Sequence, residues 1–136
     1  MNKVAYIERK KFVKYDDKHY LLYLNEEKAT VTDKETEKSV EGFAYTGPMP
    51  DGSTMIEAQN VTDENRRDRF VSGLIGTEYD INAQIAILAN GKDTEKHAEE
   101  FAIFEANRET AKKSVDELLA RPLLKNSDLW HDRLQQ

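Results

Sequence analysis

Hydrophobic and polar positions divide the chain into two parts with different periodicities. From residue 3 to about residue 59, short apolar runs alternate with turn residues such as the pair Asp51-Gly52. This spacing is typical of short antiparallel strands. We predict extended segments at residues 3–7, 12–15, 19–24, 29–32, 39–46 and 53–58, which form a five- or six-stranded antiparallel sheet that curls toward a barrel.

Beyond residue 60, apolar residues recur at helical spacing. The pattern predicts three helices, at residues 62–75, 79–90 and 93–121, and a short helical tail after Pro122. The second helix is apolar or small around most of its circumference, which predicts burial on more than one side. Because no long linker separates the two parts, we expect one α+β domain covering residues 1–136.

The longest predicted helix has a thin apolar stripe that Arg108 interrupts. We expect the half with Phe101 and Phe104 to pack on the fold, and the later half to be available for a partner. Leucines and a tryptophan near the chain end would be costly to leave in water, and tryptophan is a favoured interface anchor. The predicted partner-binding residues are Val115, Leu118, Leu119, Leu129 and Trp130.

The composition excludes several kinds of chemistry and favours a location away from membranes. The chain has 136 residues, a formal net charge of −6 and no cysteine, so disulfides, thiolate nucleophiles and thiolate metal sites are excluded. No apolar run approaches the ~18 residues that a membrane span requires, and no secretory signal is visible. We therefore expect a cytoplasmic protein that does not contact membranes.

Motifs of the common enzyme classes are missing. The chain contains no Gly-x-Ser-x-Gly elbow, phosphate-binding loop, dinucleotide fingerprint or His-Glu-x-x-His pair. His97 and Glu100 share one helix face, but a closed metal site needs about four ligands. We predict that the protein is not an enzyme and holds no metal or cofactor.

Two basic clusters favour an alternative function. If they converge, they could grip a nucleic-acid backbone through their positive charge. The acidic remainder of the chain permits the opposite alternative, an inhibitor that mimics nucleic acid, of the kind that phages and mobile elements encode. A small-molecule pocket inside the sheet, bordered by tyrosines and His19, is a further alternative. The clusters consist of Arg9, Lys10, Lys11, Arg66, Arg67 and Arg69.

The leading hypothesis is a non-enzymatic protein-interaction module that self-associates. It depends on the apolar stripe of the long helix, the apolar chain end and the missing catalytic motifs.

Overall fold

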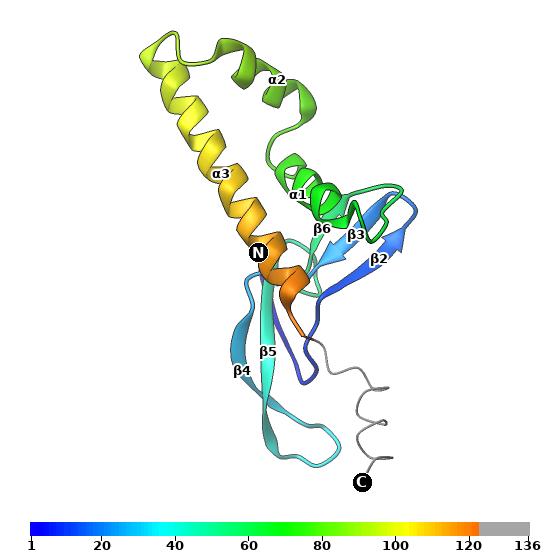
Figure 1. Ribbon diagram of the computed structural model, residues 1–136. Coiled ribbons are helices and arrows are strands. Elements are labelled where there is room, and N and C mark those ends of the chain that lie inside the picture. Colours follow the sequence, from blue (N-terminus) through cyan, green and yellow to red (C-terminus); the bar gives the residue numbers. More distant parts are fainter. Residues whose placement is uncertain (123–136) are drawn as a thin grey trace.

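The computed structural model describes residues 1–122, which form an α+β fold of six strands followed by three helices (Figure 1). The predicted class and the three predicted helices are confirmed, whereas the predicted tail lies outside the described residues. The elements are β1 Asn2–Tyr6, β2 Phe12–Asp16, β3 His19–Leu22, β4 Glu27–Thr32, β5 Ser39–Gly47, β6 Thr54–Glu57, α1 Arg66–Gly76, α2 Ile81–Asn90 and α3 Glu95–Ala120.

The strands form two separate three-stranded antiparallel sheets, so the prediction of one curled five- or six-stranded sheet is wrong. The strand orders are β1-β5-β4 and β2-β3-β6. The pairs β2–β3 and β4–β5 are hairpins of consecutive strands. By contrast, β1 pairs with β5 and β6 pairs with β3, which are far from them in the sequence. Short strands with similar patterns do not specify these long-range pairings.

A change of direction between β3 and β4 separates the two sheets. Asn25 has a left-handed backbone conformation, with φ +56, which asparagine tolerates better than most residues. Its side-chain amide donates a 3.1 Å hydrogen bond to the carbonyl oxygen of Thr46. After this residue, β4 pairs with β5 instead of continuing the first sheet.

The core lies where α1 and the second half of α3 meet the β2-β3-β6 sheet. Phe70 of α1 is fully buried, and its ring centroid lies 5.1 Å from those of Phe12 and Tyr20 on the sheet. Val115 and Leu118 of α3 are also fully buried in this cluster. The second half of α3 is thus part of the chain's own core.

The first half of α3 extends away from the sheets, with α2 alongside it (Figure 1). We call α2 and this half of α3 the arm. Tyr79 stacks edge-on against Phe104 at 5.0 Å and holds the base of the arm. No residue of α2 is buried, so the prediction that α2 is buried on more than one side is wrong. Within residues 1–122, no helix is both long and apolar enough to cross a membrane.

Capping residues define the ends of the arm helices. The carboxylate of Asp80 accepts a 2.7 Å hydrogen bond from the backbone N–H of Ala83 and begins α2. Gly91 ends α2 with φ +59, a conformation that costs glycine little. Thr94 then caps α3 by accepting a hydrogen bond from the N–H of His97.

Candidate interaction surface

Among residues 1–122, the most exposed group of large aliphatic side chains lies on α2. Ile81, Ile85 and Leu88 are 67%, 57% and 56% exposed. Their spacing of four and three residues places them on one side of the helix, and we call them the apolar face of α2. Ile103, on the α3 half of the arm, is also 57% exposed. Clustered exposed apolar side chains of this kind are typical of interaction sites.

The charge of α2 differs from that of the rest of the chain. The helix contains no charged residue, and its only polar residues are Asn82, Gln84 and Asn90. The whole chain carries a net charge of −6. Depletion of charge around exposed aliphatic side chains is the composition that distinguishes the centre of a protein–protein interface from ordinary surface.

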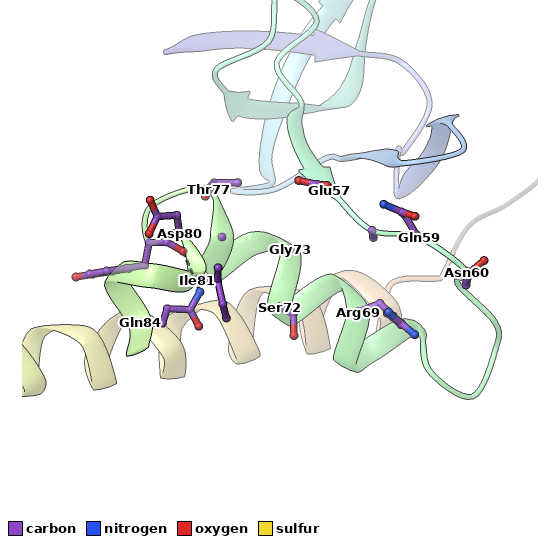
Figure 2. A pocket seen from close by; sticks show the side chains of 13 residues that line it. Glu57, Gln59, Asn60, Arg69, Ser72, Gly73, Thr77, Asp80, Ile81 and Gln84 are labelled. Atoms are coloured by element: carbon purple, nitrogen blue, oxygen red, sulfur yellow. Dashed lines mark hydrogen bonds between the residues drawn. The ribbon is translucent and has the colours of Figure 1, made fainter. Parts of the chain in front are cut away.

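A polar groove begins at one end of this face (Figure 2). The groove has a volume of about 710 Å³ and runs along the outer side of α1 to the first turn of α2. Ile81 belongs to both the groove and the apolar face. The polar side chains around it come from three segments and include Glu57, Gln59, Asn60, Arg69, Ser72, Asp80 and Gln84.

A second cleft, of about 490 Å³, lies between α3, the end of α1 and the loop that precedes β6. All three methionines of the chain line it, together with Leu74 and Ala111. Methionine side chains adapt to irregular apolar surfaces. His19 lies outside both cavities and instead contacts the carboxylate of Asp16 at 2.8 Å. The cleft therefore differs from the pocket bordered by tyrosines and His19 that the sequence suggested.

The predicted partner-binding residues are placed differently from the apolar face. Val115 and Leu118 are 0% exposed because they pack in the core. The structure therefore corrects the prediction that these two side chains are available to a partner. Leu119 is partly buried against the same core. Leu129 and Trp130 lie outside the described residues.

Sequence reasoning predicted that α2 is buried and so did not identify its apolar face as an interaction surface. Isoleucine and leucine recur there at helical spacing on a helix without charge, a pattern shared by buried helices and by interface helices. Only the tertiary structure separates these two cases.

The two basic clusters are largely neutralised by carboxylates of the same chain. Arg9 contacts Glu26 at 2.6 Å, Arg66 contacts Asp63 at 2.9 Å, and Arg67 contacts Asp116 at 2.6 Å. The remaining members differ in setting: the Lys10 ammonium lies 4.9 Å from the Tyr6 ring centroid, Lys11 is half-buried before β2, and Arg69 is exposed in the groove. The clusters therefore present less free positive charge than the sequence suggests.

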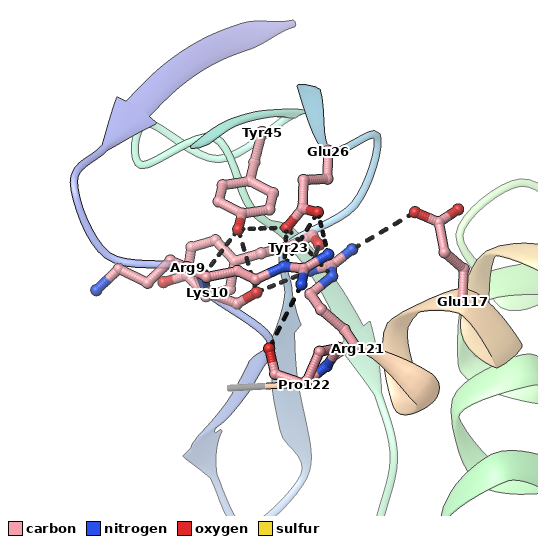
Figure 3. A network of polar contacts seen from close by, with 8 residues as sticks. All are labelled: Arg9, Lys10, Tyr23, Glu26, Tyr45, Glu117, Arg121 and Pro122. Atoms are coloured by element: carbon pink, nitrogen blue, oxygen red, sulfur yellow. Dashed lines mark hydrogen bonds and ion pairs between the residues drawn. The ribbon is translucent and has the colours of Figure 1, made fainter. Parts of the chain in front are cut away.

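A buried polar network joins the end of α3 to both sheets (Figure 3). The side chain of Arg121 is only 2% exposed. Its guanidinium donates hydrogen bonds of 2.8 and 2.9 Å to the carbonyl oxygens of Lys10 and Tyr23. It also lies 3.3 Å from the carboxylate of Glu26. Arg121 thus fixes the end of α3 to segments that precede β2 and follow β3.

The Glu26 carboxylate at the centre of this network is fully engaged. It accepts hydrogen bonds from Arg9 at 2.6 Å and from the Tyr45 hydroxyl at 2.7 Å. Burial alone would raise the pKa of Glu26, but these hydrogen bonds and the charges of the two arginines together lower it. A carboxylate held ionised by several donors suits a structural role better than proton transfer.

Alkaline pH is expected to destabilise the fold through Tyr45. Burial, reinforced by the Glu26 carboxylate and opposed by the Lys10 backbone, raises the pKa of Tyr45 from 10.0 to about 12. Its contribution to stability is therefore complete below pH 10 and is lost as pH rises from 10 toward 12, at up to ~1.4 kcal/mol per pH unit. Urea unfolding at several pH values between 10 and 12 would measure how steeply the free energy of unfolding falls with pH. Tyr45→Phe should make this fall less steep, and an unchanged pH dependence would show that Tyr45 is not responsible.

Histidines and carboxylates do not gather into a metal site within residues 1–122. His97 instead contacts the Asp93 carboxylate at 2.5 Å, beside the cap of α3. No protein-family model, curated protein sequence or solved structure matches the chain.

Proposed function

We propose that the protein is a non-enzymatic protein-interaction module that self-associates through the apolar face of α2. The observation that carries this proposal is the exposure of Ile81, Ile85 and Leu88 on an uncharged helix that projects from the body of the molecule. Self-association is favoured over an unrelated partner because a face without charge meets no like-charge repulsion from a second copy, even though each chain carries −6.

The expected affinity follows from the size of the face. Complete burial of a leucine or isoleucine side chain contributes roughly 1.5–3 kcal/mol. Two copies would bury six such side chains that are 56–67% exposed in one copy, which amounts to roughly 5–10 kcal/mol before the cost of association. Because that cost is at least about 4 kcal/mol, we expect a weak, concentration-dependent dimer.

Placing two carboxylates on the apolar face should abolish self-association. The variant Ile85→Glu with Leu88→Glu puts four like charges into a symmetric contact, which opposes both desolvation and close approach. Multi-angle light scattering over a wide concentration range should show dimer for the wild type and monomer for the variant. The α2 side chains contribute little to the core, so circular dichroism should be unchanged.

A matched control separates the face from the effect of added charge. Val13 and Tyr15 on β2 are 47% and 59% exposed, and Val13→Glu with Tyr15→Glu adds the same charge at a different surface. This control should still dimerise. A wild-type chain that stays monomeric at every concentration would contradict the proposal, as would a control that dissociates as fully as the α2 variant.

Nucleic-acid binding is the weaker alternative because Arg9, Arg66 and Arg67 pair with carboxylates of their own chain. Retention on an oligonucleotide at low salt, lost when Arg69 is replaced, would favour that alternative. An inhibitor that mimics nucleic acid would instead bind a basic nucleic-acid-binding protein through its acidic surface.

A further inference from the structure

We infer that two copies dock with their α2 helices antiparallel, about a two-fold axis that passes beside Ile85. This inference rests on the proposed self-association and defines the arrangement of the second copy. It follows from the position of Ile85 within the apolar face and from the charges at the two ends of α2.

Ile85 occupies the centre of the apolar face. It follows Ile81 by four residues and precedes Leu88 by three. In a symmetric two-fold contact the same patch is present on both copies. Antiparallel helices centred on Ile85 place each Ile81 opposite Leu88 of the second copy, and each Ile85 opposite itself.

Charges at the two ends of α2 distinguish antiparallel from parallel docking. Glu78 lies seven residues before Ile85 and Lys92 lies seven residues after it, with Asp80 as the only charged residue between them. Both Glu78 and Lys92 are exposed. Antiparallel docking brings Lys92 of each copy toward Glu78 of the other, whereas parallel docking would place like charges together.

The local contacts of these groups leave them available. Lys92 lies with its ammonium 5.1 Å from the Phe101 ring centroid, and Glu78 accepts a hydrogen bond from the Asn107 amide. Asp93, the acid next to Lys92, is already held by His97. The Asp93 carboxylate keeps its negative charge but is directed to His97, whereas the Lys92 ammonium contacts an aromatic ring and no carboxylate in the part of the chain that the structure describes.

The groove of Figure 2 extends the contact beyond the helix itself. The ten residues of α2 form a helix only ~15 Å long. A helix of this length is too short to bury by itself the ~800 Å² that each partner contributes to a standard interface. In the antiparallel arrangement the residues after Leu88 of the second copy reach the mouth of the groove, where Asp80 and Ile81 lie. The polar groove thus lies where additional contact area is needed.

Single cysteines test the arrangement directly because the chain has none of its own. A disulfide requires Cα atoms within ~7 Å. At ~1.5 Å per residue, antiparallel docking separates the two Ile81 positions by ~12 Å and the two Leu88 positions by ~9 Å along the helices. Under mild oxidation, Ile85→Cys should form covalent dimers several-fold faster than Ile81→Cys or Leu88→Cys. A mixture of those two slow variants should cross-link with each other. Val13→Cys on β2 measures the rate of random collision.

Charge reversal supplies a second measurement that does not depend on oxidation. Lys92→Glu should weaken the dimer in light scattering, and adding Glu78→Lys should restore it. If all three α2 cysteines cross-link to themselves equally fast, or if the double reversal fails to restore the dimer, the antiparallel arrangement is overturned while self-association stands. If the wild type is monomeric and no α2 cysteine exceeds the collision rate, the proposed function itself fails.

Discussion

Replacement of Arg121 by methionine is expected to lower the free energy of unfolding by about 3–5 kcal/mol, as expected when one partner of a buried ion pair is removed. Methionine keeps much of the side-chain volume but makes none of the hydrogen bonds. The carbonyl oxygens of Lys10 and Tyr23 would lose their donor, and the Glu26 carboxylate would lose one of its two arginine partners. Urea denaturation followed by circular dichroism would measure the change.

An exposed arginine provides the matched control. Arg67 also pairs with a carboxylate, donating hydrogen bonds of 2.6 and 3.2 Å to Asp116 between α1 and α3. Its side chain is 47% exposed, against 2% for Arg121. Solvent-exposed ion pairs contribute about 0–1 kcal/mol, so Arg67→Met should have a small effect. Equal losses for the two variants would show that burial does not decide the importance of Arg121.

Truncation of Phe70 to alanine is expected to destabilise the protein by about 3–5 kcal/mol, the usual range for phenylalanine in a core. Phe70 is fully buried and contacts two aromatic rings of the β2-β3-β6 sheet. Its removal leaves a cavity between α1 and the sheet that the surrounding rings fill only in part. Thermal or urea unfolding would report the loss.

The control for Phe70 is an exposed aromatic residue of the same sheet. Tyr15 on β2 is 59% exposed, and surface substitutions usually change stability by about 0.5 kcal/mol or less. Tyr15→Ala should therefore remain close to the wild type. A loss of less than about 1 kcal/mol for Phe70→Ala would contradict the packing described here, because so small a loss is atypical of a buried phenylalanine.

Stability and self-association are expected to depend on different residues. Phe70 and Arg121 stabilise the body, where sheets and helices meet, whereas Ile81, Ile85 and Leu88 lie on the arm and outside the core cluster. Substitutions in the first set should change unfolding at every protein concentration. Substitutions on the arm should change it only where dimer is populated, because only dimerisation links stability to concentration.

Much of the secondary structure could be predicted from the sequence because it depends on local patterns. Turn residues separated the six strands, and helical spacing of apolar residues predicted the three helices. The cap at Asp80 also depends on local chemistry, because aspartate at a helix start accepts a backbone hydrogen bond. Strand pairing was not predictable, because the pairs β1–β5 and β3–β6 join segments far apart in the chain.

The candidate site shows the same division between local and non-local information. The sequence by itself determined that residues 79–90 and 93–121 form helices with apolar residues at helical spacing, since this pattern needs only a period of about 3.6 residues. It could not determine which of these apolar residues the chain covers. The tertiary structure places Val115 and Leu118 in the core and leaves Ile81, Ile85 and Leu88 in solvent. The physical reason is that burial depends on contacts with distant elements, here Phe70 of α1 and the β2-β3-β6 sheet, which cover the second half of α3 but not the apolar face of α2.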